Sequence, residues 1–190
     1  MRVGVAAVVP AAGQSTRFGT MKLLADVGGA PLLERTLASL LDAGVARVVV
    51  VTRAGEAFEA VPSMADPRVT VSVNPDPARG MFSSIQAGLA VAGGDVVLVL
   101  PADMPFVAPD TAAAVVARAA ATQSVVVPTH QARRGHPIAI PGRLCDALLA
   151  LAPTTTLKDA LASSGEAIVQ LQVTDAGVLR DVDVPADLMR

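Results

Sequence analysis

The sequence predicts an α/β fold with three layers and a mostly parallel sheet, because strand-like and helix-like segments alternate along the chain. Short apolar runs such as Val3–Val9 and Val96–Leu100 are typical of strands that are buried on both faces. Other segments repeat apolar residues at helical spacing, as in Pro31–Asp42. We find no linker, internal repeat or low-complexity segment in the sequence, so we expect residues 1–190 to form a single domain.

The strands and helices can be placed from apolar runs, apolar periodicity and turn residues. The expected strands are Val3–Val9, Val48–Thr52, Val69–Val73, Val96–Leu100 and Val125–Val127. The expected helices are Pro31–Asp42, a helix capped by Ser83 or Ser84 that runs to about Val91, and Pro109–Ala121. Gly44 and Gly93 stand where the first two helices should stop, since glycine favours helix C-termini.

The composition is that of a compact globular domain. Of the 190 residues, 52% are hydrophobic and the mean hydropathy is +0.53, which argues against disorder. A net charge of −2 and an aromatic content of 2% leave neither a basic surface nor a stacking platform for nucleic acid. No apolar stretch approaches the ~18 residues that a membrane span requires. The single cysteine, Cys145, excludes an intrachain disulfide and suits a helix packing position. We therefore expect a cytoplasmic protein that binds neither nucleic acid nor membrane.

The first turn is the most informative stretch of the sequence. After the apolar run come Pro10-Ala11-Ala12-Gly13-Gln14-Ser15-Thr16-Arg17-Phe18-Gly19, and Lys22 follows shortly. Small side chains allow a polyphosphate to approach backbone N–H groups, and an arginine and a lysine can balance its charge. The spacing fits neither a Walker P-loop nor the glycine pattern of dinucleotide folds, which makes a dinucleotide-dependent oxidoreductase improbable.

A second turn carries an acidic side chain to the same edge of the predicted sheet. The run Val96–Leu100 ends in Pro101-Ala102-Asp103-Met104-Pro105, and ligands of α/β sheets bind beyond the carboxyl ends of the strands. Mg²⁺ is typically held by one or two carboxylates together with substrate phosphates, so Asp103 is a candidate ligand for Mg²⁺. The alternative is an ordinary aspartate in a turn between two prolines.

A second candidate ligand stands near the end of the sequence. Asp181-Val182-Asp183 alternates as a strand does, which would place both carboxylates on one face, where they repel unless a cation lies between them. Asp183 is our candidate, with Asp181 as the substitute. The alternative for Asp183 is an N-cap of a helix that begins at Pro185, and Asp187 suits the first turn of that helix.

Three further groups have both a ligand-binding and a local interpretation. Gly80, Ser83 and Ser84 should lie at a helix N-terminus that faces the ligand, where one serine caps the helix and the other can contact a nucleotide. Arg134 and His136 could contact an acceptor substrate, although they equally suit a solvated turn. Neither histidine has an obvious acidic partner in the sequence, and we expect His130 to be structural.

The chain resembles the MobA-like NTP-transferase family, and within it the cytidylyltransferases that act on the molybdenum cofactor. The blocks that carry the resemblance follow the family's order over nearly the whole chain: Ala11 to Gly19, Lys22-Leu23-Leu24, Asn74-Pro75, Gly80 to Ile85, Pro101 to Pro105, Arg134 to Pro137 and Asp181 to Leu188. Two positions depart from the pattern. Pro10, before Ala11-Ala12-Gly13, resembles the pattern of the isoprenoid-pathway cytidylyltransferases. Val184 replaces the threonine that is usual in the closing motif.

The resemblance implies a three-layer Rossmann-like nucleotidyltransferase fold and Mg²⁺-dependent transfer of a nucleotidyl group, with CTP favoured by Ala12, onto a phosphorylated acceptor such as molybdopterin. The nucleotide would be held by residues of two loops: Ala11, Ala12, Gly13, Ser15, Asn74, Gly80, Ser83 and Ser84. Arg17 would contact the leaving pyrophosphate, and Lys22 would stabilise charge at the α-phosphate. Arg134 and His136 would bind the acceptor, and Asp103 and Asp183 would hold the metal.

Two other functions remain open from the sequence. The first is a cytidylyltransferase for a sugar phosphate or an isoprenoid alcohol phosphate, which Pro10 favours. The second is a nucleotide-binding protein without catalysis, against which the intact set of Arg17, Lys22 and Asp103 argues.

Overall fold

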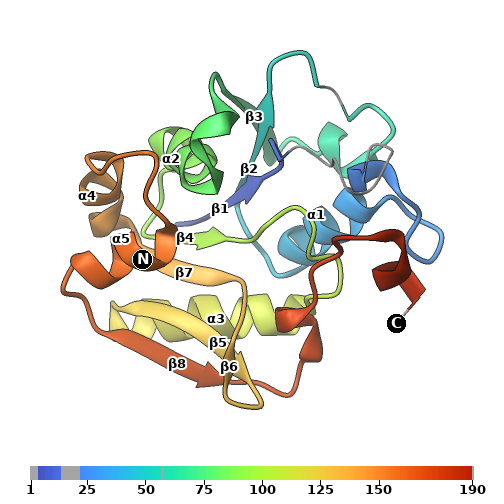
Figure 1. Cartoon of the computed structure of the whole chain (residues 1–190). Helices are drawn as coiled ribbons and strands as arrows, with labels where there is room; N and C mark the ends of the chain where they lie inside the picture. Colours follow the sequence, from blue (N-terminus) through green and yellow to red (C-terminus); the bar gives the residue numbers. More distant parts are fainter. Residues whose placement is uncertain (1–3, 14–21, 57, 190) are drawn as a thin grey trace.

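The computed structural model describes residues 4–13, 22–56 and 58–189, and it contains a mixed sheet flanked by helices on both faces (Figure 1). Within these residues the sheet has eight strands in the order β3-β2-β1-β4-β7-β5-β6, with β8 paired to β5. The pairs that join β3, β2, β1 and β4 are all parallel, whereas β7 runs antiparallel to both β4 and β5. The expected α/β class with a mostly parallel sheet is confirmed.

All five predicted strands form, with ends that differ by one to three residues, and the described residues contain three more strands that we did not predict. They are β1 (Val5–Pro10), β2 (Arg47–Arg53), β3 (Val69–Asn74), β4 (Val96–Val99), β5 (Val125–His130), β6 (Arg133–Arg134), β7 (Ile138–Pro141) and β8 (Ile168–Gln172). Of the predicted strand Val3–Val9, Val3 lies outside the described residues.

The helices agree with the predicted periodicity, and two short ones are additional. They are α1 (Leu32–Asp42), α2 (Met81–Ala92), α3 (Pro109–Thr122), α4 (Cys145–Leu149) and α5 (Leu157–Ser163). The described residues also contain six 3-10 turns: η1 (Lys22–Leu24), η2 (Pro62–Ala65), η3 (Pro77–Arg79), η4 (Gly142–Leu144), η5 (Ala176–Leu179) and η6 (Pro185–Met189). Gly44 and Gly93 follow α1 and α2 with positive φ, as helix ends require.

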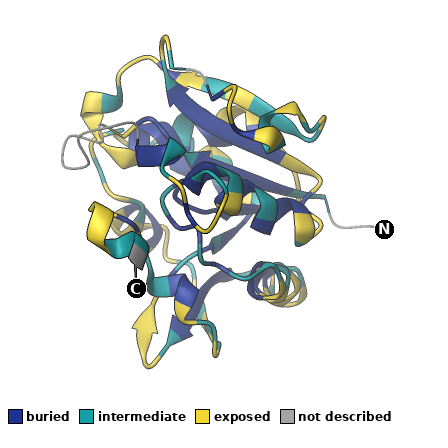
Figure 2. Cartoon of the chain, turned by 90° about the vertical axis from the view of Figure 1, so that its right-hand side faces the viewer, coloured by how far each residue is buried: buried dark blue, intermediate teal, exposed yellow. Residues whose placement is uncertain are grey.

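Alternation along the central strands divides the core between the two faces of the sheet. On one face Val9, Val48 and Leu98 pack with α1 and α3. On the other face Val8 and Val49 pack with α2, α4 and α5. Successive side chains of a strand point to opposite faces, so each buried strand supplies both cores. Figure 2 shows the resulting buried centre with the exposed residues around it.

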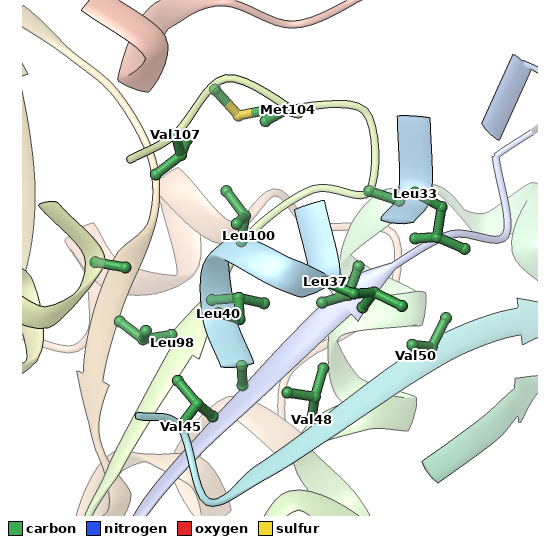
Figure 3. Close-up of a cluster of buried hydrophobic side chains, with 14 of the residues drawn as sticks. Leu33, Leu37, Leu40, Val45, Val48, Val50, Leu98, Leu100, Met104 and Val107 are labelled. Carbon is green, nitrogen blue, oxygen red and sulfur yellow. The ribbon is translucent and has the colours of Figure 1, made fainter. Parts of the chain in front are cut away.

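The core on the α1 face also reaches the loop that follows β4. Leu37 and Leu40 of α1 lie over β1 and β2, while Leu100, Met104 and Val107 continue the same cluster beyond the end of β4 (Figure 3). Met104 and Val107 are buried, so the loop after β4 is held by packing as well as by its backbone. This matters for function because Asp103 belongs to that loop.

Two predicted local structures are wrong. Helix α2 is capped by Gly80, with φ 103°, and not by Ser83 or Ser84, which lie inside its first turn. A serine cap became unnecessary because Gly80 adopts a backbone conformation that L side chains rarely adopt and starts the helix three residues earlier. Asp181–Asp183 is not a strand. Val182 is nevertheless buried between two exposed aspartates, because it packs into the α1-face core.

In the part of the chain that the structure describes, no helix is both long and apolar enough to cross a membrane.

Close packing between α2 and the sheet predicts a stability effect at Gly88. A Cβ at this position would overlap Cγ1 of Val8 and crowd a methyl group of Val51. We expect Gly88→Ala to lower the free energy of unfolding by at least about 1 kcal/mol, because overpacking outweighs the gain in helix propensity. Urea denaturation measures the change. Ala90→Ser, on the exposed face of α2, should stay within about 0.5 kcal/mol of the unmodified protein. Equal free energies of unfolding for G88A and the unmodified protein would contradict the expected overlap with Val8.

Candidate active site

Two loops meet at one edge of the sheet because the strands that precede them are parallel neighbours. β1 and β4 pair in parallel, so the loops after Pro10 and after Val99 emerge side by side. The amide of Ala102 donates a hydrogen bond to the carbonyl of Pro10 at 3.2 Å, and the amide of Ala11 donates to the carbonyl of Val51 at 2.8 Å. These bonds fix the start of the first loop between the ends of β2 and β4.

Helix α1 and the C-terminal segment both hold the loop that follows β4, which contains Ala102 and Asp103. The Thr36 hydroxyl, buried in α1, donates to the carbonyl of Ala102 at 3.0 Å. The amide of Val182 donates to the carbonyl of Asp103 at 2.9 Å, and the Val182 side chain is fully buried. Asp103 and Asp183, 80 positions apart in sequence, are brought together by this bond.

The two predicted metal ligands converge on one cation, the ammonium of Lys22. Lys22 Nζ lies 2.9 Å from Asp103 Oδ2 and 3.2 Å from Asp183 Oδ1. The Lys22 side chain is 10% exposed, whereas those of Asp103 and Asp183 are 27% and 53% exposed. A buried ammonium of this kind is stable only with anionic partners, so the three side chains form one electrostatic unit.

The electrostatics of Lys22 follow from this geometry. Burial by itself lowers the pKa of the Lys22 ammonium, but its hydrogen bonds to Asp103 and Asp183 and their charges outweigh burial. The net effect raises the pKa of Lys22 above its ordinary value. The lysine is therefore fully charged at neutral pH, as a role beside phosphates requires.

Asp187 fixes the backbone that presents Asp183. Its Oδ2 accepts hydrogen bonds from the amides of Asp183 at 2.9 Å and Val184 at 3.0 Å. These two amides come just before the short turn Pro185–Met189, where unpaired N–H groups attract a carboxylate. Asp187 thus positions the candidate metal ligand, a role that goes beyond the helix-end charge expected from the sequence.

The residues opposite Lys22 and the two aspartates are arranged around a buried asparagine, Asn74. Asn74 Nδ2 donates to the hydroxyls of Ser83 at 2.8 Å and Ser84 at 2.9 Å, and its Oδ1 accepts from the amide of Asp76. Asn74 is 1% exposed, so it is a positioning residue for the two serines and the following turn. The Ser83 hydroxyl also donates to the carbonyl of Gly80 at 2.7 Å, which turns it away from a ligand.

A cavity of about 240 Å³ lies between these walls. Its lining is Pro10, Ala11, Ala12, Gly13, Lys22, Leu23, Pro77, Gly80, Met81, Ser84, Pro101, Ala102, Asp103 and Asp183. The structure thus gathers eight of the predicted site residues around one space. Ser15 and Arg17 lie outside the described residues.

Four predicted residues do not line the cavity. Asn74 and Ser83 stand behind its wall, and Arg134 is exposed on the short strand β6. His136 is half-buried, and its amide donates to the carbonyl of Val178. Burial lowers the pKa of the His136 imidazole, although the nearby charges of Asp103 and Asp181 oppose this shift. The fold therefore gives His136 acidic neighbours that its sequence surroundings do not reveal.

Sequence reasoning missed the apolar part of the lining and one positioning residue. Met81, Pro77 and Leu23 border the cavity although none carries an obvious chemical signal. Thr36 is in the middle of a helix and contacts the site across 66 positions. Only its polarity at an apolar, core-facing helix position could have singled it out.

The site can be compared with known proteins now that its geometry is clear. Residues 7–168 match the MobA-like NTP transferase domain, which covers most of the chain. The chain belongs to the MobA-like NTP transferase family. The resemblance noted in the sequence is therefore confirmed, and the protein is a nucleotidyltransferase-family member.

Relatives with assigned names include enzymes for two acceptors. The chain is 38% identical over 127 residues to a 2-C-methyl-D-erythritol 4-phosphate cytidylyltransferase of Rhodococcus opacus (strain B4), covering 65% of this chain and 55% of that protein. The chain thus spans about half the length of that relative. It is 29% identical to a probable molybdenum cofactor guanylyltransferase of Natronomonas pharaonis, covering 96% and 94% of the two chains. It is 23% identical to the molybdenum cofactor cytidylyltransferase of Escherichia coli (strain K12), covering 96% and 92%.

Solved structures share the MobA-like fold. Rv0371c of Mycobacterium tuberculosis H37Rv has a TM-score of 0.82 at 25% identity, covering 99% of this chain and 97% of that one. A complex of Rv0371c with manganese has a TM-score of 0.74 at 21% identity, covering 98% and 97%. A CMP:2-keto-3-deoxy-manno-octonic acid synthetase complexed with CTP has a TM-score of 0.77 at 18% identity, covering 97% and 95%.

The lowered pKa of His136 predicts how stability depends on pH. A neutral imidazole is favoured in the folded protein, whereas the unfolded chain takes up this proton near pH 6.5. The free energy of unfolding should therefore fall as the pH decreases below about 6.5, until the pKa of folded His136 is reached. His136→Gln should reduce this fall, measured by urea denaturation between about pH 7.5 and 5. If the free energy of unfolding of H136Q depends on pH as it does in the unmodified protein, the lowered pKa of His136 is contradicted.

Proposed function

We propose that the protein transfers CMP from CTP onto a phosphorylated acceptor, molybdopterin or the molybdenum cofactor, and releases pyrophosphate. One observation carries the proposal: two carboxylates from distant segments converge on one cation beside a cavity lined by the small residues Ala11, Ala12 and Gly13. Family membership gives the reaction class. We further propose that the protein is cytoplasmic.

The donor set suits a divalent cation such as Mg²⁺. Asp103 and Asp183 supply carboxylate oxygens that already approach a common point, where Lys22 Nζ now lies. Mg²⁺ is typically bound by one or two carboxylates with substrate phosphates completing its coordination. The manganese complex of Rv0371c supports a divalent ion in this fold. When bound, the ion would neutralise phosphate charge and polarise the α-phosphate.

The chain's own residues bind and orient the reactants. Backbone N–H groups of the first loop can approach a triphosphate because the side chains from Ala11 to Gly13 are small. The Lys22 ammonium borders the same cavity and can stabilise charge that develops at the α-phosphate. On sequence grounds, we keep Ser15 as a contact of the triphosphate and Arg17 as a contact of the leaving pyrophosphate.

The reaction needs no strong general base. An oxygen of the acceptor phosphate, already ionised at neutral pH, attacks the α-phosphorus of CTP. The bond from that phosphorus to the bridging oxygen breaks, and both electrons leave with pyrophosphate. Positioning and charge neutralisation carry most of the rate for such steps. The charge of Asp103 acts on the pKa of His136, so His136 lies near the proposed metal site. We propose that His136 and Arg134 contact the acceptor.

The choice of CTP rests on the second residue of the first loop. Ala12 is buried and borders the cavity, so its methyl group takes space that a purine would need. The Ser84 hydroxyl, also at the cavity, can hydrogen-bond a pyrimidine edge. Relatives named as a guanylyltransferase and a cytidylyltransferase are 29% and 23% identical to this chain, so a comparison of CTP with GTP tests the base.

A second acceptor is supported by a specific observation. The relative from Rhodococcus opacus is 38% identical over 65% of this chain, compared with 29% and 23% for the two molybdenum cofactor relatives. Its name gives 2-C-methyl-D-erythritol 4-phosphate as acceptor. Pro10, which precedes the first loop, favours this acceptor as well. Both reactions use CTP and release pyrophosphate, so one assay compares them.

Nucleotide and acceptor choice can be tested together. We expect pyrophosphate release with CTP, Mg²⁺ and molybdopterin or its molybdenum form, and a higher kcat/KM for CTP than for GTP. Ala12→Gly should relax the preference only partly, since one methyl group contributes about 1–3 kcal/mol. Turnover with 2-C-methyl-D-erythritol 4-phosphate instead would establish the second acceptor. Equal kcat/KM for CTP and GTP would refute the base assignment.

The metal assignment can be tested by removing one charge at a time. Asp103→Asn should keep the fold, since it is nearly isosteric, and should lose most of the Mg²⁺-dependent turnover because an amide is a poor ligand for a hard dication. Asp183→Asn should behave similarly, whereas Asp181→Asn should be close to the unmodified enzyme. Steady-state kinetics over a range of Mg²⁺ concentrations measures the effect. Damage confined to D181N would reassign the second ligand.

A further inference from the structure

Lys22 occupies the place between the carboxylates that the proposed function gives to a divalent cation. Its ammonium donates hydrogen bonds to Asp103 Oδ2 at 2.9 Å and to Asp183 Oδ1 at 3.2 Å. The residue is 8% exposed, so this contact is not a loose surface pair. A lysine is rarely buried to this extent unless its ammonium is paired with an anionic group, as it is here.

An ammonium and a divalent cation cannot both use these oxygens. Mg²⁺ requires its oxygen ligands at about 2.0–2.1 Å, and it tolerates little distortion of its octahedral coordination. A positive charge held at hydrogen-bond distance from the same oxygens repels the ion and competes for their lone pairs. An ion that binds between the carboxylates, at Asp103 Oδ2 and Asp183 Oδ1, therefore displaces the ammonium.

The ammonium has a second place to go within the same cavity. Lys22 and the first loop, from Ala11 to Gly13, line one space. The backbone of Lys22 is fixed in the turn η1, where its carbonyl accepts from the amide of Ala25 at 3.0 Å. The four-carbon side chain above this fixed backbone is flexible, so its end can move while its base stays in place.

We propose that Lys22 is the internal counter-ion of Asp103 and Asp183 in the free protein, and that the divalent cation displaces it only when a triphosphate arrives to accept the ammonium. The proposal rests on the metal assignment of the proposed function. It gives Lys22 two successive partners: first the carboxylates, then a phosphate of the nucleotide. The carboxylates are thereby kept together before the ion binds.

The proposal predicts weak binding of a divalent ion by the free protein. In the absence of nucleotide the ion must move the ammonium away from Asp103 and Asp183, which are the acidic side chains among the described residues that line the cavity. With nucleotide present, the phosphates compensate the ammonium and supply further ligands to the ion. Binding of ion and nucleotide should therefore be strongly cooperative, and most of this coupling should depend on Lys22.

Mn²⁺ is a suitable probe because its free form gives an electron paramagnetic resonance signal that decreases on binding. We propose titrations of the full chain with Mn²⁺ alone, comparing the unmodified protein with Lys22→Met and Lys22→Gln. Lys158→Met is a matched control. The chain has two lysines, and Lys158 is exposed on α5, so this variant removes the same charge elsewhere.

We expect K22M to bind Mn²⁺ at least about tenfold more tightly than the unmodified protein, because a full positive charge beside the ligands is removed. K158M should match the unmodified protein. Adding Asp103→Asn to K22M should abolish the gain, which localises the ion. A smaller gain in K22M, or no gain, overturns the proposal. K22Q keeps the test valid should K22M not fold.

A second measurement follows the ammonium itself. In protein labelled with ¹³C at lysine Cε, two signals are expected, and the K158M variant assigns the one from Lys22. Mg²⁺ together with a CTP analogue that has a methylene group between the α- and β-phosphates should shift the Lys22 signal, and Mg²⁺ alone at the same concentration should not. An equal shift by Mg²⁺ alone would overturn the ordered displacement.

The two proposals fail in different ways. If Mn²⁺ does not bind the unmodified protein even with the CTP analogue, the metal assignment of the proposed function fails. If Mn²⁺ binds with the analogue but K22M shows no gain without it, only the displacement of Lys22 fails. Neither titration depends on which acceptor the enzyme uses.

Discussion

The parallel pairing of β1 with β4 is the constraint on which the rest of the site depends. Parallel neighbours end at the same edge of a sheet, so the small-residue loop after β1 and the acidic loop after β4 must lie side by side. The bond from Ala102 to Pro10 joins their first residues directly. The proposed phosphate-binding loop and the proposed metal ligand Asp103 are thereby placed together by strand pairing and backbone hydrogen bonds.

The C-terminal segment completes the site through its backbone. The amide of Val182 bonds the carbonyl of Asp103, and the buried Val182 side chain anchors this segment in the core. Asp183 is next in the chain and therefore falls beside Asp103, and Asp187 sets the path of the chain beyond it. A hydrophobic anchor next to a functional carboxylate fixes that carboxylate more firmly than a charge contact on the surface could.

The burial of Lys22 sets its desolvation against its contacts with two carboxylates. Desolvation disfavours the ammonium, and only the two carboxylates restore its charge. In our proposal, a triphosphate replaces those partners, which keeps the lysine charged and frees the carboxylates for a metal ion. The same three side chains thus serve the free and the loaded protein. The near-burial of Lys22 makes its interactions with the carboxylates stronger than they would be in water.

The sequence by itself determined the fold class, the central strands and helices, and the two loops that carry Lys22 and Asp103. These follow from local signals, namely apolar periodicity, glycine and proline at turns, and small residues before a cluster of charges. It also singled out Asp183, because two aspartates around one valine suggested a shared cation.

Tertiary structure alone decided the interactions that join segments far apart in sequence. Sequence patterns could not show that Val182 would bond Asp103, that Thr36 would hold Ala102, or that His136 would lie near Asp103 and Asp181. They also misplaced the start of α2, since a glycine at φ 103° left Ser83 and Ser84 to bond Asn74. The physical reason is that backbone partners and burial depend on how the chain packs, whereas local patterns report only what each segment can form by itself.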